Sequence, residues 1–134
     1  MIDRSAFLTE NKLMTLSSLS QTGGPRAVPV AFMYDNGKFY ISSGRGTRKV
    51  RNIESDNRVA FTVEDSTRQK AIVGTGKARV IPTGGNYDQL LKKLITHLVG
   101  SLEHPYAKIM LSSDRVLVEI TPTTIKGWDL PPTD

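Results

Sequence analysis

The sequence contains no cysteine, which excludes disulfides, thiolate metal sites, iron–sulfur clusters and a cysteine nucleophile. Aromatic residues make up only 7% of the chain, so a nucleic acid would find few side chains on which to stack its bases. No apolar run is long enough to span a membrane, and the N-terminal MIDRSAFLTENK has no apolar core typical of a signal peptide. We therefore expect a cytoplasmic protein.

The common catalytic motifs are also missing. The sequence has no H-E-x-x-H, G-x-S-x-G, Walker or G-x-G-x-x-G pattern, and we expect no metal site and no side-chain nucleophile. The two histidines, His97 and His104, are not accompanied by a carboxylate or nucleophile motif, so we expect both to be structural or exposed. If the protein is an enzyme, a bound cofactor should carry the chemistry.

The composition that remains is that of a small, basic, globular protein. With 134 residues, the chain is expected to form a single domain over residues 1–134. Eighteen Lys and Arg residues against thirteen Asp and Glu give a net charge of +5, which favours anionic partners such as nucleotides, phosphates and polycarboxylates.

Alternating apolar residues and turn signals predict a mainly β fold with a few helices. We expect the sheet to be mostly antiparallel and curled into a barrel, because hairpin signals dominate the first half of the chain. Four helices are expected: a short one capped by Asp3, another at 50–55, a longer amphipathic one at 86–102, and a short one at 105–111. The seven predicted strands cover 12–21, 26–34, 38–43, 59–63, 70–81, 115–121 and 124–128.

Prolines, glycines and asparagines add local detail. Pro29 cannot donate a ladder hydrogen bond and suggests a sheet edge, a strand end or a bulge, whereas Pro122 is expected to separate the last two strands. The Asp35-Asn36-Gly37 sequence predicts a tight hairpin. Gly74 and Gly76 indicate a bulge or a close backbone approach. Asn86 is the expected N-cap of the long helix.

The most unusual stretch is SGRGTRKVRN at residues 43–52, which has four cationic side chains and two glycines. A strand that turns through glycines into a helix exposes unpaired N–H groups at the helix start, and the helix dipole favours an anion there. Ser43 and Thr47 add hydroxyls, while Arg48 and Lys49 add charges that can hold a phosphate. The alternative is a solubilising helix start whose arginines pair with Glu54, Asp56 and Glu64.

The run FYISSGRGTRKVRNIESDNRVAF resembles the split β-barrel family that binds FMN, which includes pyridoxamine 5′-phosphate oxidase and the small reductases dependent on deazaflavin (coenzyme F420). The similarity rests on an aromatic strand, a small polar pair, a Ser/Thr, two basic residues, a helical Asn and D-x-R-V. These features are Phe39 to Ile41, Ser42-Ser43, Thr47, Arg48-Lys49, Asn52 and Asp56 to Val59. PRAVPVAF, GTGKARVI, the long helix and the strand with Trp128 follow in the family's order, so the resemblance spans nearly the whole chain.

The resemblance implies a cofactor site between two subunits of a homodimer. Phosphate binding would fall to Ser43, Thr47, Arg48 and Lys49, and the ring would lie against Val28, Pro29 and Val30. Arg45, with Arg51, would suit the oligoglutamate tail of F420, while Ser42 and Asn52 belong to the shared pattern and the partner chain would contribute Lys70 or Trp128. KGWDLPPTD stands where the oxidase has an arginine-rich segment for pyridoxal phosphate, so vitamin B6 oxidation is not expected.

Three functions remain open from the sequence. The first is an oxidoreductase that uses F420 or FMN to transfer a hydride to or from a small organic substrate. The second is a protein that binds the cofactor without turnover. The third is a nucleic-acid-binding barrel, which the lack of aromatic residues within the basic stretch disfavours.

Overall fold

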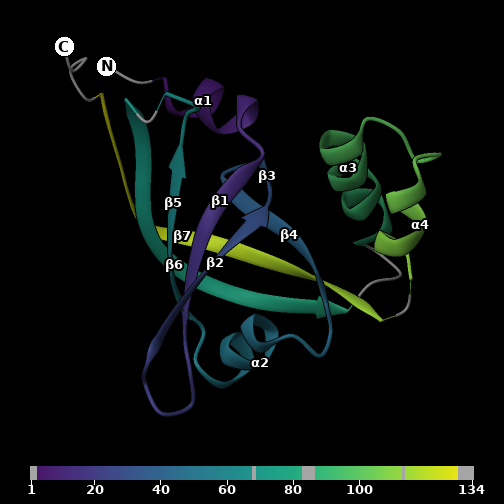
Figure 1. Ribbon diagram of the computed structural model, residues 1–134, viewed down its shortest axis with the longest axis horizontal. Coiled ribbons are helices and arrows are strands. Elements are labelled where there is room, and N and C mark those ends of the chain that lie inside the picture. The colour runs from purple at the N-terminus through teal and green to yellow at the C-terminus, as the bar shows by residue number, and fades with distance from the viewer. Residues whose placement is uncertain (1–2, 68, 83–86, 113, 130–134) are drawn as a thin grey trace.

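The structure is a computed structural model that describes residues 3–67, 69–82, 87–112 and 114–129. Seven antiparallel strands form one curled sheet in the order β2-β1-β5-β6-β7-β4-β3, a split β-barrel as predicted (Figure 1). The strands are β1 (Leu13–Leu19), β2 (Pro25–Ala31), β3 (Met33–Asp35), β4 (Lys38–Gly44), β5 (Arg58–Glu64), β6 (Lys70–Pro82) and β7 (Arg115–Asp129). The helices are α1 (Arg4–Glu10), α2 (Arg48–Ser55), α3 (Asp88–Val99) and α4 (Pro105–Met110).

Local chemistry explains most element boundaries. The Asp3 side chain accepts a hydrogen bond from the Ala6 N–H and caps α1, as predicted. Asn36 and Gly37 have φ values of 50° and 80°, which the tight β3–β4 hairpin requires. Pro29 lies in β2, an edge strand of the sheet, so its missing N–H is tolerated. The predicted cap Asn86 lies outside the described residues.

Two of the strand predictions are wrong. The strand predicted at 26–34 is two strands, β2 and β3, with Phe32 between them. The strands predicted at 115–121 and 124–128 are wrong in the opposite sense. They are a single strand, β7, and Pro122 does not separate them. Pro122 lies opposite Gly76, where the β6–β7 register shifts between Thr75 and Gly76. The shift leaves Thr123 of β7 as the extra, unpaired residue of a bulge beside Pro122, and the ladder continues on both sides of it.

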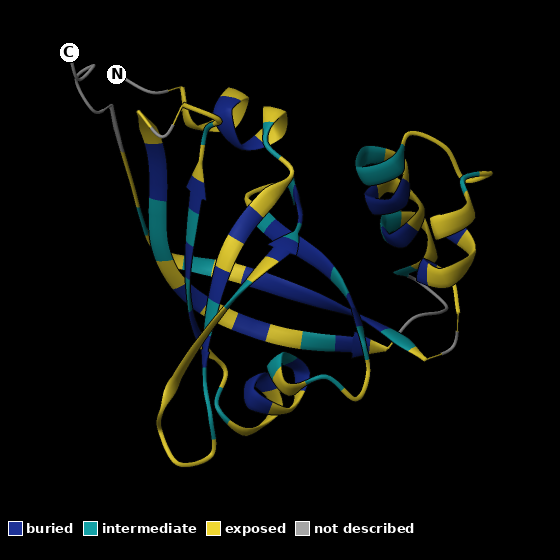
Figure 2. Ribbon diagram, in the orientation of Figure 1, coloured by how far each residue is buried: buried dark blue, intermediate teal, exposed yellow. Residues whose placement is uncertain are grey.

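Two apolar cores lie on opposite faces of the sheet. The barrel interior holds the aromatic group of Phe32, Phe39 and Phe61, whose neighbouring ring centroids lie 5.7 Å and 4.6 Å apart. The second core lies between α3–α4 and the outer face of β3, β4, β6 and β7 (Figure 2). Lys93 in α3 donates to Asp35 at 2.6 Å, which fixes α3 beside the β3–β4 hairpin. No helix among the described residues has the length and apolarity to cross a membrane.

Candidate functional site

A groove of about 580 Å³ lies between the sheet and the α3–α4 pair, and we call it the cationic groove. Three of its lining residues are basic, and none of its described lining residues is acidic. Apolar side chains supply most of the walls, which is typical of sites for small organic ligands. The lining residues are Lys12, Leu13, Pro29, Val30, Ala31, Ser42, Lys49, Leu98, Val99, Tyr106, Ile109, Met110 and Arg115.

Strand alternation separates the two predicted serines. Ser42 and Ser43 are neighbours on β4, so their side chains point to opposite faces of the sheet. Ser42 points to the outer face and lines the groove, where its hydroxyl accepts hydrogen bonds from Arg115 Nε and Nη2 at 3.4 Å and 3.2 Å. Ser43 is buried, and its hydroxyl lies 3.0 Å from the Thr47 hydroxyl. Ser43 therefore supports the loop from the inside, and Ser42 faces the groove.

Two cations stand close together at the end of the groove next to α2. Burial, with the charges of Arg115 and Arg26, lowers the pKa of Lys49. Burial also lowers the pKa of the Arg115 guanidinium. None of the ion pairs found among the described residues includes Lys49. An anion bound between Lys49 and Arg115 would relieve this repulsion, so the electrostatics favour a negatively charged ligand.

The first turn of α2 adds backbone donors beside Lys49. Thr47 is the N-cap residue, but its side chain makes no capping hydrogen bond. Its hydroxyl instead donates to the Gly44 carbonyl at 3.0 Å and contacts Ser43. The N–H groups that Thr47 would otherwise cap are left to another acceptor, and a phosphate oxygen is a suitable one. Thr47 thus shapes the loop and does not line the cationic groove, and its contact with a phosphate stays a prediction.

The predicted basic residues do not all meet in one place. Arg48 and Asn52 line a separate polar cleft of about 390 Å³ on the other side of α2, together with Arg51, Ser20, Gln21 and Thr22. Asn52 is buried and donates to the Ser18 hydroxyl at 3.2 Å, so it also fixes α2 to β1. The helix therefore carries Lys49 on one side and the two arginines on the other.

Four other predicted residues lie away from the groove. Val28 packs against the barrel core, and exposed Arg45 donates its N–H to the Asp114 carbonyl at 2.8 Å. Lys70 and Trp128 are on the paired ends of β6 and β7, where Ala71 lies opposite Trp128. Figure 1 shows these strand ends at the opposite end of the molecule from α2. A contact of Lys70 or Trp128 with a cofactor bound to a second copy of the chain stays a prediction.

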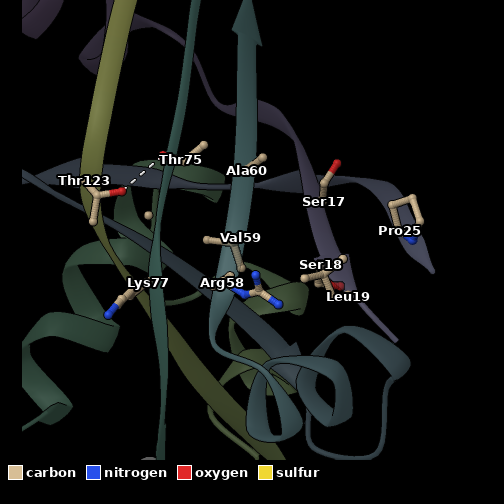
Figure 3. Close-up of a pocket in the computed structure, with 11 residues that line it drawn as sticks. Ser17, Ser18, Leu19, Pro25, Arg58, Val59, Ala60, Thr75, Lys77 and Thr123 are labelled. Carbon is tan, nitrogen blue, oxygen red and sulfur yellow. Dashed lines mark hydrogen bonds between the residues drawn. The ribbon is translucent and has the colours of Figure 1, made fainter. Parts of the chain in front are cut away.

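A third cavity, which we call the outer pocket, has about 460 Å³ and lies on strands β1, β5, β6 and β7 (Figure 3). Its cations are Arg58 and Lys77, but Arg58 already forms two hydrogen bonds with Asp56, at 3.0 Å and 2.7 Å. Figure 3 also shows Thr75 hydrogen-bonded to Thr123. None of the predicted site residues lines this pocket, so we take the cationic groove as the candidate site.

Neither histidine lines the groove. His104 caps α4, because its Nδ1 accepts a hydrogen bond from the Tyr106 N–H at 3.1 Å. Its ring stacks on Tyr106 with centroids 5.5 Å apart. Nε2 of His97 is buried without a partner, and burial and the charge of Lys12 lower the pKa of this histidine. Both positions agree with structural roles.

Sequence reasoning missed two of the three basic residues in the groove, Lys12 and Arg115, and most of its apolar wall. Arg115 reaches the site because β7 pairs with β4, which places Arg115 opposite Gly44. Among the missed residues, only Leu98 and Val99 could have been found from the sequence, since both belong to the apolar stripe of the long helix. Lys12 and Arg115 are isolated cations at the start of a strand, and such residues form no pattern that indicates a site.

The lowered pKa of Lys49 predicts that anion binding weakens with rising pH. Lys49 should lose its proton at a lower pH than an ordinary lysine, so affinity should fall as the pH passes through this lowered value. In the ligand-free protein, burial disfavours the charged form of Lys49. The free energy of unfolding should therefore rise as the pH increases from this lowered pKa to 10.5, the pKa of an ordinary lysine. Calorimetric titration with sulfate at several pH values measures the change in affinity, because the charge of sulfate stays constant in this range.

The matched variant is Lys49→Arg, which keeps the charge and does not titrate in this range. We expect it to bind sulfate with an affinity that no longer depends on pH. An identical pH profile in both proteins would mean that another group controls binding.

Comparison with known proteins agrees with this architecture. Residues 4–129 match the pyridoxamine 5′-phosphate oxidase family. A 5a,11a-dehydrotetracycline/5a,11a-dehydrooxytetracycline reductase from Streptomyces rimosus is 37% identical over 79 residues, which are 52% of this chain and 56% of that protein. The chain thus matches only about half of that relative's length.

Two solved structures share the fold. An F420 reductase superposes with a TM-score of 0.73 at 22% identity, covering 91% of this chain and 94% of the reductase. The heme storage protein HutZ from Vibrio cholerae has a TM-score of 0.78 at 16% identity, covering 95% and 92% of the two chains. At these identities the likeness concerns the fold alone. The family match covers nearly the whole chain, and the protein belongs to the pyridoxamine 5′-phosphate oxidase family.

Proposed function

We propose that this protein is an oxidoreductase that binds F420 or FMN in the cationic groove and transfers a hydride between that cofactor and a small organic substrate. The observation that carries the proposal is the pair Lys49 and Arg115, two partly buried cations at the end of an apolar groove. The family supports a flavin-type cofactor, and the named activity of the Streptomyces relative supports reduction of a small organic molecule.

The residues of the groove fit the two parts of such a cofactor. Lys49, Arg115 and the first N–H groups of α2 suit a phosphate, because cations and unpaired N–H groups converge there. Pro29 and Val30 offer an apolar surface on the sheet side for a flat ring. We propose that Arg48 and Arg51, in the polar cleft, contact further anionic groups such as the carboxylates of an F420 tail.

The protein's part in the reaction is binding, orientation and exclusion of water. A bound flavin or deazaflavin supplies the hydride chemistry. Among the described lining residues of the groove there is no carboxylate and no histidine, so we assign no side-chain acid or base, and solvent supplies any proton the substrate needs. Orientation of two reactants in a dry site can lower a barrier by about 7–11 kcal/mol, which leaves little need for further groups.

The proposal is tested by titrating the purified protein with FMN and with F420 and following the cofactor absorption spectrum. We expect one cofactor to bind at one site per chain, and the reduced bound form to be reoxidised by a substrate. Absence of binding by both cofactors would contradict the proposal. Stable binding without reoxidation by any small acceptor would favour the second function, a protein that binds the cofactor without turnover. A cytoplasmic location remains a prediction.

We further propose a homodimer with two equivalent cofactor sites. The hydrogen-bonded order of the sheet ends at β2 and β3, so two strand edges stay open to a partner. Light scattering at micromolar concentration should give twice the mass of one chain. A monomer under these conditions would contradict the proposal, and a dimer that Lys70→Ala leaves intact but with weaker cofactor binding would assign Lys70 to the partner's site.

A further inference from the structure

Large apolar side chains on the walls of the cationic groove are exposed to solvent. Tyr106 and Ile109 line the groove and remain 62% and 53% exposed. They are three residues apart on α4, so their side chains lie on the same face of that helix. His104 stacks on the Tyr106 ring at an interplanar angle of 14°, which holds the ring in a defined orientation. Leu13, from the opposite side of the groove, is 66% exposed.

The charges of the groove are divided between its two ends. Lys49 is in the first turn of α2, whereas Lys12 immediately precedes β1, whose first residue Leu13 pairs with Ala31 at the end of β2. Figure 1 shows this start of β1 beside β3 and away from α2, so Lys12 belongs to the end of the groove away from the proposed phosphate site. The charge of Lys12 also lowers the pKa of His97 in α3, which agrees with this placement. The main chain of Lys12 is fixed there, because the Lys12 carbonyl accepts a hydrogen bond from the Phe32 N–H at 2.9 Å.

We infer that this second half of the groove binds the substrate, and that the substrate is a flat, largely apolar organic anion. Tyr106 and Ile109 contact its apolar body, and Lys12 binds its acidic group. This inference rests on the proposed function, since it places the substrate beside a cofactor whose phosphate occupies Lys49 and Arg115.

Three observations lead to this substrate class. A flat apolar body would cover the side chains that α4 and Leu13 leave exposed. With no carboxylate among the described lining residues, a cationic substrate would meet three basic side chains without compensation. Of the three basic residues that line the groove, Lys49 and Arg115 are assigned to the cofactor phosphate. Lys12 is left, and it can bind an acidic group of the substrate.

Two fluorescent probes that differ in one group test the inference on cofactor-free protein. 1-Anilinonaphthalene-8-sulfonate is a flat apolar anion, and N-phenyl-1-naphthylamine is its uncharged counterpart. We expect one molecule of either probe to bind per chain. Lys12→Met should weaken binding of the sulfonate about tenfold, the value of one charge-assisted contact, and leave the uncharged probe unchanged. Tyr106→Ala with Ile109→Ala should weaken both probes about tenfold.

Matched controls locate the bound probe. Lys77→Met removes a cation from the outer pocket, and Leu102→Ala removes an exposed apolar side chain that does not line the groove. Neither change should affect either probe, and an excess of inorganic phosphate should not displace the sulfonate. Displacement by phosphate, an unchanged sulfonate affinity in Lys12→Met, or a loss in either control variant would overturn the inference.

The probe result can be separated from the cofactor proposal. The probes are titrated without cofactor, and the same variants are titrated separately with FMN and F420. The inference expects Lys12→Met to keep its cofactor affinity within about threefold. If the wild-type protein binds neither cofactor, the proposed function fails, whatever the probes show. If the cofactor binds but the probes do not follow the predicted pattern, only the substrate inference fails.

Discussion

Replacing Lys49 and Arg115 together with methionine should weaken cofactor binding by roughly a thousandfold. Each charge-assisted hydrogen bond to a phosphate contributes on the order of 2 kcal/mol, and two such losses correspond to about 4 kcal/mol. Neighbouring charges are not strictly additive, so the single variants must be measured beside the double one. Titration of FMN and F420 at one fixed salt concentration gives the affinities, since electrostatic binding depends on ionic strength.

The fold should survive this change. Burial lowers the pKa of both basic groups, so neither charge is favoured by its surroundings in the free protein. Thermal unfolding of the double variant checks the point. Lys77→Met is the matched control, because Lys77 is an exposed cation of the outer pocket and should leave cofactor affinity unchanged. A double variant that binds both cofactors within about threefold of the wild-type affinity would contradict the phosphate site.

Much of the groove's sheet side was predictable from the sequence. Pro29, Val30, Ser42 and Lys49 were expected at a cofactor site, and the structure brings these four together in one groove. Whether they bind the cofactor remains a prediction. The sequence could not separate Lys49 from Arg48, because the direction of each side chain depends on how α2 packs against β1. Two adjacent helical positions point about 100° apart, which is enough to place them in different cavities.

The opposite wall was hidden for a physical reason. Tyr106, Ile109 and Arg115 are far in sequence from β4, and they reach the groove through tertiary packing and the β4–β7 pairing. Neither tertiary packing nor the pairing of strands distant in sequence leaves a local pattern of residues. Most strand positions, by contrast, followed from alternation and turn chemistry, which are local, although the predicted strand 26–34 is divided into β2 and β3. The division of the last strand at Pro122 failed because pairing with Gly76 of β6, more than forty residues earlier, continues the ladder past this proline.

Gly74→Val should destabilise the protein by about 3 kcal/mol or more, which would lower Tm by roughly 10 °C in a domain of this size. A Cβ atom at position 74 would lie 2.5 Å from Cζ of Phe61, and closer still to the Thr124 carbonyl oxygen. Phe61 cannot easily move away, because it is buried and its ring centroid lies 4.6 Å from that of Phe39. The carbonyl belongs to β7, which pairs with β6 along its length.

A glycine at position 74 therefore allows β6 to pack closely against both the β7 main chain and the Phe61 ring of β5. Gly46→Ala is the matched control, because an added Cβ there has no heavy atom within 4 Å and should change Tm by less than about 2 °C. Differential scanning calorimetry of both variants measures the two effects under the same conditions. A Gly74→Val protein that unfolds at the wild-type temperature would mean that β6 moves away from β7 and Phe61 at little cost, and the close contact at Gly74 would then not constrain the barrel wall.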